Sequence, residues 1–212
     1  MSRSRILFAS GIIAAVAMLT QLAARVFSAF DGVKILQDRG LRDTDIGSIL
    51  TMVHLSLIIF PVIAFAILAI DKINRTSGLL VAIGYPVAFV VTSGTAWIGY
   101  ICGCKQLPIV TAMAMGCVCD LLLLLALLRV KNMVPLPLWT LAIIATAYIF
   151  VSGIGRGGVS LCRQFAGVSS NGLDEFSSIL RNATEWPQIA GYGVLVGYFL
   201  VQAATCNMAK SK

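Results

Sequence analysis

Six long apolar stretches make up most of this chain of 212 residues, and polar segments separate them. A helix of about 20 apolar residues crosses the hydrocarbon core of a bilayer, and each stretch reaches that length. The chain is 58% hydrophobic and only 12% charged, which is about half the charged fraction of a soluble domain. The sequence therefore predicts an all-α polytopic membrane protein, a single bundle of six transmembrane helices. The predicted spans cover residues 6–30, 46–70, 78–103, 107–128, 134–155 and 187–206.

The polar segments alternate in charge along the chain. The N-terminus, the segments after the second and fourth spans and the C-terminus carry Lys and Arg against a single acid, Asp71. The other three segments balance their basic residues with acids. Because Lys and Arg gather on the cytosolic side of membrane proteins, we predict that both termini are cytosolic.

The net charge of +7 thus reflects basic residues that mark the cytosolic side of a membrane protein. We predict no nucleic-acid partner. The predicted partner is the lipid bilayer. A plasma membrane or endomembrane is favoured over an organelle inner membrane, because no amphipathic presequence precedes the first span.

The longest polar segment, 156–186, is predicted to be an outer loop with a short amphipathic helix. Its apolar residues Leu173, Phe176 and Leu180 recur at helical spacing between polar ones. Such a helix either lies on the membrane surface or packs over the mouth of the bundle. Asn182 begins an Asn-Ala-Thr sequence, which predicts glycosylation on this outer side.

Three ionisable residues, Arg25, His54 and Asp120, fall inside predicted spans. Burying charge in lipid is costly, so such residues are the best functional candidates. With a rise of about 1.5 Å per residue, they lie roughly 8, 12 and 20 Å below the outer surface. We predict a polar pathway open to the outside, in which Asp120 binds a cation or proton and His54 relays or tunes it. Other polar residues predicted to line this pathway are Gln21, Thr51, Thr92 and Ser93.

A structural interpretation of the same residues stays open. Asp120 could pair with His54 or with hydroxyl groups and only hold helices together. Arg25 could extend to the outer headgroups, as long basic side chains do near helix ends.

The six cysteines do not have the spacing of a zinc site, and we predict no metal and no cofactor. A disulfide between Cys162 and either Cys102 or Cys104 would tie the 156–186 loop to the turn between the third and fourth spans. It requires an oxidising outer compartment.

Small residues at four-residue spacing mark close-packing helix faces. Gly193 and Gly197 form such a pair in the last span. Faces of this kind predict either a homo-oligomer or an assembly with other membrane subunits.

The segment Asp71-Lys72-Ile73-Asn74-Arg75 resembles the loop signature of major facilitator transporters. The sequence departs from that signature at Ile67, where the family has glycine, and the chain has half the usual length of the family. We therefore predict no membership of that family.

Three functions remain open from the sequence. The first is a small transporter or channel component that moves a small solute, ion or proton. The second is a non-catalytic accessory or scaffolding subunit of a larger membrane complex. The third, an intramembrane enzyme acting on lipid, has the least support, because no catalytic residues stand out and the chain has one histidine.

Overall fold

The computed structural model describes residues 3–104, 107–130, 134–165 and 171–208. Within these ranges several side chains, including those of Thr51 and His54, lie outside the description. The described chain is all-α, and its helices are α1 (Arg3–Ala29), α2 (Gly32–Asp38), α3 (Asp43–Leu68), α4 (Arg75–Ile101), α5 (Leu107–Arg129), α6 (Leu136–Phe165) and α7 (Asn171–Met208).

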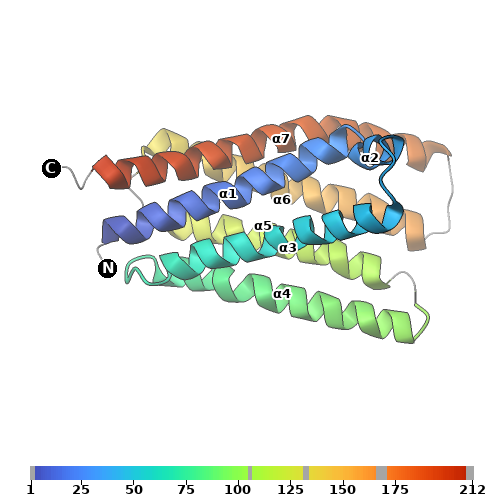
Figure 1. Cartoon of the computed structure of the whole chain (residues 1–212), viewed down its shortest axis with the longest axis horizontal. Coiled ribbons are helices and arrows are strands. Elements are labelled where there is room, and N and C mark those ends of the chain that lie inside the picture. Colours follow the sequence, from blue (N-terminus) through green and yellow to red (C-terminus); the bar gives the residue numbers. More distant parts are fainter. Residues whose placement is uncertain (1–2, 105–106, 131–133, 166–170, 209–212) are drawn as a thin grey trace.

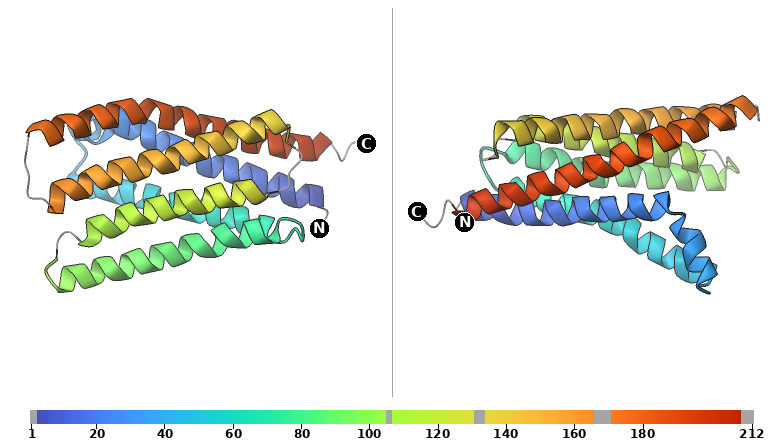
Figure 2. Two further views of the ribbon diagram at one scale, coloured as in Figure 1. Left: turned by 180° about the vertical axis from the view of Figure 1, so that it is seen from behind. Right: turned by 90° about the horizontal axis from the view of Figure 1, so that it is seen from above.

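The six long helices form a closed ring. Each one packs against its neighbours in the chain, and α1 closes the ring by packing against α7. Short connections make sequential helices antiparallel neighbours, so both chain ends lie at the same end of the bundle (Figure 1). The short helix α2 lies at the opposite end. There, α2 and the start of α3 diverge from the other helices (Figure 2).

The helices α1 and α7 approach at backbone distance. A methyl group at Gly11 would lie 3.0 Å from the Phe199 carbonyl oxygen and 3.2 Å from the Ala203 nitrogen. Small residues permit such close contact between helices. The first and last helices are therefore held together by van der Waals packing along a face that tolerates no larger residue at Gly11.

The turn between α3 and α4 is tied to the start of α1. Asp71 is buried, accepts a hydrogen bond of 2.7 Å from the Asn74 side-chain amide and pairs with the Arg3 guanidinium at 3.3 Å. These contacts satisfy the carboxylate that resembled part of a transporter loop signature, and they give it a structural role at this end of the bundle.

The prediction of an outer loop with a separate surface helix over 156–186 is wrong where the structure describes it. Helix α6 continues to Phe165, and α7 already begins at Asn171, sixteen residues before the predicted start of the last span. The glycines at 153, 155, 157 and 158 disfavour a helix by intrinsic propensity. Contacts between α6 and α7 offset that preference, since the Arg156 guanidinium bonds to α7.

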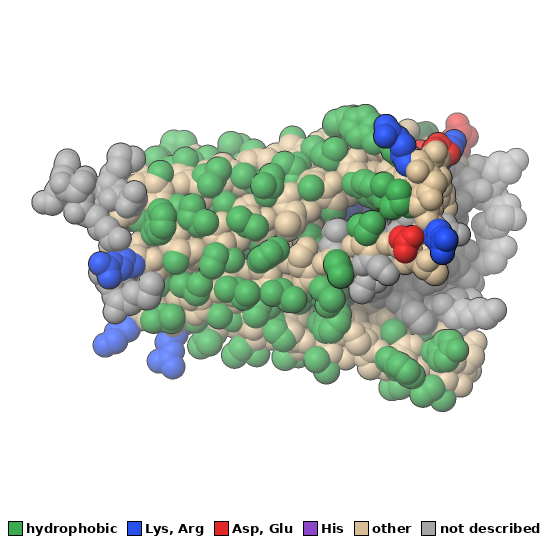
Figure 3. All heavy atoms as spheres, viewed as in Figure 1, with side chains coloured by type: hydrophobic (Ala, Val, Ile, Leu, Met, Phe, Trp, Pro, Cys, Tyr) green, Lys and Arg blue, Asp and Glu red, His purple; other side chains and the backbone are tan. Residues whose placement is uncertain are grey.

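Four helices are long and apolar enough to cross a membrane, judged by length and composition of the described residues. Their candidate spans are Arg3–Ala29, Arg75–Ile101, Leu136–Val159 and Glu175–Cys206. Helix α3 contributes a shorter apolar segment, Leu55–Leu68. Hydrophobic side chains cover the middle of the visible face, while charged side chains gather at its two ends (Figure 3). A soluble monomer rarely exposes apolar surface so continuously, which is why membrane association follows.

Candidate functional site

Polar side chains from five helices converge inside the ring. We call this set the polar layer, and its members are Arg25 of α1, Tyr85 of α4, Asp120 of α5, Ser152 and Arg156 of α6, and Gln188 and Tyr192 of α7.

Helix direction tilts the side chains of Arg25 and Asp120 toward each other along the axis of the bundle. Side chains in a helix lean toward its N-terminus, and α1 runs antiparallel to α5 (Figure 1). Arg25 therefore leans from the end of α1 toward the middle of the bundle, while Asp120 leans from the middle of α5 toward the end that carries α2. The positive charge of Arg25 acts on the Asp120 carboxylate. The two residues therefore lie within electrostatic range of each other, on helices that do not pack together.

The electrostatic interaction between Arg25 and Asp120 crosses the interior of the ring. The described backbones of α1 and α7 do not pack against that of α5, yet Arg25 and Tyr192 both interact with Asp120. Arg25 also hydrogen-bonds to the Tyr192 side chain. The polar layer is thus a central feature that links helices on opposite sides of the bundle.

The immediate surroundings of Asp120 are small and polar. A methyl group at Gly153 of α6 would lie 3.7 Å from Asp120 Oδ2 and 3.8 Å from the Cys117 sulfur. Tyr85 and Tyr192 are both buried and within electrostatic range of the carboxylate. Gly153 therefore leaves room beside the carboxylate that any longer side chain would fill.

Hydrogen bonds between α6 and α7 complete the layer. Arg156 donates to the Thr184 hydroxyl at 2.6 Å. One turn closer to the centre, the Gln188 amide donates to the Ser152 hydroxyl. Gln188 is only 1% exposed, and its carbonyl oxygen has no hydrogen-bond partner among the described residues.

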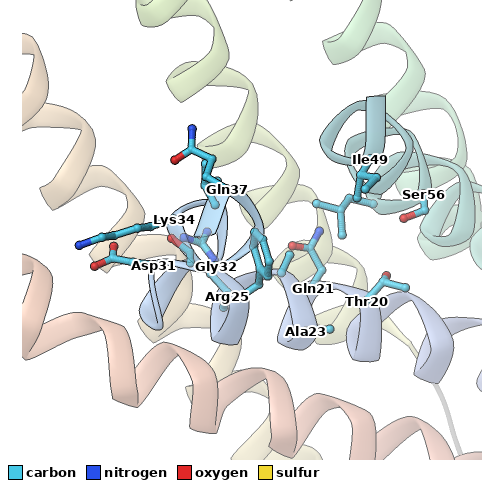
Figure 4. Close-up of a pocket in the computed structure, with 15 residues that line it drawn as sticks. Thr20, Gln21, Ala23, Arg25, Asp31, Gly32, Lys34, Gln37, Ile49 and Ser56 are labelled. Carbon is cyan, nitrogen blue, oxygen red and sulfur yellow. The ribbon is translucent and has the colours of Figure 1, made fainter. Parts of the chain in front are cut away.

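A cavity of about 1050 Å³ lies between α1, α2 and α3, toward the end of the ring opposite the chain termini. Its polar lining includes Gln21, Arg25 and Ser28 of α1 and Ser56 of α3, and its apolar lining includes Phe27. Figure 4 shows Arg25, Gln21 and Thr20 following one another along α1, with Ile49 and Ser56 facing them from α3. Arg25 belongs both to this cavity and to the polar layer, so it connects the two.

The structure brings together part of the predicted pathway. Arg25 and Gln21 line the cavity, and Asp120 is partly buried in the polar layer. Thr92 is half-buried on α4, where its hydroxyl donates to the Phe89 carbonyl at 3.1 Å and contacts Met115 of α5. Ser93 lies beside it on the same helix and is also half-buried. The side chains of His54 and Thr51 lie outside the described residues.

The predicted modification sites lie in the half of the bundle away from the chain termini. Cys102, Cys104 and Cys162 are exposed free thiols, and the disulfide stays a prediction. Asn182 is exposed on α7, whereas Thr184 of the same sequence is buried against Arg156. No group of three His, Cys, Asp or Glu side chains able to hold a metal ion occurs in the described part of the chain.

Sequence reasoning missed five members of the polar layer, one of which is Ser152. Arg156 was assigned to a loop, although it lies within a helix. Tyr85, Tyr192 and Gln188 lie in apolar spans. Polar residues inside such spans could have been named as site candidates together with the charged ones.

Comparisons with protein families, with curated proteins and with solved structures find no match to this chain.

Proposed function

We propose that this chain crosses the membrane six times, with both termini in the cytosol. The ring supports this arrangement, because α3 and α5 lie between helices that are each long and apolar enough to span a bilayer. The end of the bundle that holds both termini also carries Arg3, Arg75 and Arg129 at helix ends. Positive charge of this kind favours the cytosolic side.

We further propose that the protein is a small transporter or channel component for a small solute, ion or proton. One observation carries this proposal: a cavity toward the end of the ring opposite the chain termini is lined by Arg25, which lies within electrostatic range of Asp120. Ionisable groups inside a membrane bundle are costly and typically mark a substrate or ion pathway. Arg25 lines the cavity and acts on Asp120, so a solute that enters from outside meets this pair.

Purified protein in liposomes tests this function. Proton flux is followed with a pH-sensitive dye trapped inside, and uptake of small labelled ions and solutes is measured in parallel. We expect flux with the natural chain and at least about tenfold less with Asp120→Asn, because the site loses its charge. The matched control is Thr140→Ala, which removes an exposed hydroxyl from α6 and should leave flux unchanged.

The accessory-subunit function is the second candidate, and an open helix face favours it. A methyl group at Gly193 or at Gly197 would meet nothing within 4 Å among the described residues. This small-residue pair of α7 is therefore available to a helix outside the described chain. Native mass spectrometry after gentle extraction decides between the functions: foreign chains at fixed stoichiometry support a subunit, and a monomer or homo-oligomer supports a transporter.

A further inference from the structure

We propose that the cavity between α1, α2 and α3 is open sideways to the bilayer and holds the acyl chain of a phospholipid. This inference goes beyond the proposed function, because it concerns what fills the cavity and from which side. It rests on one part of that proposal, the placement of α1 and α3 inside a membrane.

The two long helices that flank the cavity each carry an exposed apolar stripe. The side chains of the two stripes are between 38% and 52% exposed and recur at helical spacing: Ile12, Val16 and Leu19 on α1, and Leu55, Ile59 and Ile63 on α3. Both helices lie at the front of Figure 1, on the face that Figure 3 shows to be covered by hydrophobic side chains. In a chain that crosses a membrane, such a face contacts lipid chains.

The lining of the cavity joins this lipid-facing surface to the inside of the ring. Ala23 continues the α1 stripe, is exposed and lines the cavity. Ile49 of α3, which is 42% exposed, lines it from the other side. Gln21 and Leu57 are half-buried and line it from further inside. Because one cavity touches both exposed and half-buried residues of the two helices, it runs from the lipid-facing surface into the space between them.

The end of the cavity that carries α2 is charged. Arg25 of α1, Asp31 of the turn before α2 and Lys34 of α2 line this end (Figure 4). Their charges have both signs. This end therefore suits a headgroup that also carries both signs, as that of phosphatidylcholine does.

Toward the middle of the bundle the described lining is neutral. The cavity follows α1 from Ser28 to Thr20, a length of about 12 Å, and Leu57 lines it from α3 at the deeper level. The Thr20 hydroxyl donates to the Ala17 carbonyl of its own helix at 2.7 Å, so it needs no partner from a ligand. Gln21 lies beside it and can hydrogen-bond an ester oxygen. The polarity of the cavity thus changes in the same direction as that of one bilayer leaflet, from headgroups to hydrocarbon.

The volume of the cavity requires an occupant. Packed protein interiors have few voids larger than a water molecule, and an empty space leaves its walls without dispersion contacts. This cavity has about 1050 Å³ and includes the apolar side chains of Phe27, Ile49 and Leu57 in its lining. A lipid chain enters from a medium as apolar as these walls, so no polar group has to leave water.

Photolabelling from the lipid phase tests the proposal. The full chain is placed in liposomes of phosphatidylcholine, a small share of which carries a diazirine in the middle of one acyl chain. After illumination, mass spectrometry of peptides locates the adducts. We expect adducts at Leu57 as well as at Ile59, which faces the lipid, and none at Phe65 of the same helix, which is 2% exposed.

A variant that fills the mouth of the cavity separates labelling inside it from labelling by surrounding lipid. Ala23→Trp should lower the ratio of adducts at Leu57 to adducts at Ile59 by about fivefold or more, because a filled cavity leaves no room for a chain. Leu19→Trp is the matched control: it adds the same ring one turn away on the same exposed stripe, at a residue outside the described lining. The ratio should then change by less than about twofold. Thermal unfolding of both variants checks that they fold, and the natural chain is tested without any substitution.

Adducts at Ile59 without adducts at Leu57 in the natural chain would overturn the proposal. So would an unchanged ratio in a folded Ala23→Trp variant. Absence of adducts at Ile59 as well would remove α3 from the bilayer, and both the six-span arrangement and the lipid site would be lost with it. Failure of transport alone is distinguishable, because liposomes that show these adducts but no flux keep the lipid site and exclude the transporter.

Discussion

At the scale of single residues, the buried polar side chains of the described residues have hydrogen-bond partners within the bundle, except for the carbonyl oxygen of Gln188. Its amide bonds to Ser152, but its carbonyl oxygen has no partner among the described residues. An unpaired buried acceptor costs about 1–3 kcal/mol. The cost is offset by the rest of the side chain, whose amide donates a hydrogen bond from α7 to Ser152 of α6.

Replacing Ser152 by Ala should destabilise the protein by about 1–3 kcal/mol, because the buried Gln188 amide loses its acceptor. The free energy of unfolding in mixed micelles of increasing denaturing detergent measures this. Thr140→Ala, which removes a hydroxyl on the exposed side of the same helix, should change it by less than about 0.5 kcal/mol. Equal effects of the two changes would mean that the α6–α7 hydrogen bond contributes nothing.

Replacing Gln188 by Glu should be more harmful than replacing it by Leu. A buried carboxylate without an opposite charge is strongly destabilising, by about 3–5 kcal/mol, whereas Leu removes the unpaired oxygen together with the amide. The same unfolding measurement compares them. A Glu variant as stable as the Leu variant would show that Gln188 lies closer to a basic group than its hydrogen bonds indicate.

At the scale of helices, the backbones of two helices approach closely only along particular helix faces. The α1–α7 contact has no space at Gly11, whereas Gly193 on the outer face of α7 has nothing within 4 Å in the described chain. The two glycines therefore have different roles, although both lie in apolar spans.

Gly11→Leu should lower the free energy of unfolding by about 2 kcal/mol or more, because a larger side chain forces α1 away from the α7 backbone. Gly193→Leu is the matched control and should fold as the natural chain does. If Gly193→Leu also dissociates an assembly seen by native mass spectrometry, the open face is an interface. A stable Gly11→Leu variant would contradict the close packing of α1 on α7.

At the scale of the whole molecule, the proposed six spans would bring both chain ends to one side of the membrane. Epitope tags at the N- and C-termini should both be accessible only after the membrane is permeabilised. An impermeant thiol reagent should label Cys162, Cys102 or Cys104 in intact cells, since these exposed thiols lie at the other end of the bundle. Tags on opposite sides would contradict the six-span arrangement.

Several features of this fold were readable from the sequence because they depend on local composition. The all-α class follows from apolar stretches of bilayer length. The six predicted spans overlap the six long helices, since a helix satisfies its own backbone in an apolar medium. The short helix α2 and the full length of α6 and α7 were missed, because polar residues and glycines there resemble a loop and only packing extends the helices.

The amino-acid sequence alone thus determined the helical class, the alternation of basic and balanced ends, and the identity of the intramembrane charges. The tertiary structure decided that α1 closes a ring against α7. It also decided that Arg25 lies within electrostatic range of Asp120 across the ring and lines a cavity. The physical reason is that hydropathy depends on each residue by itself. The electrostatic interaction between charges far apart in the sequence depends on two things. One is the arrangement of antiparallel helices around the ring, and the other is the direction in which their side chains lean.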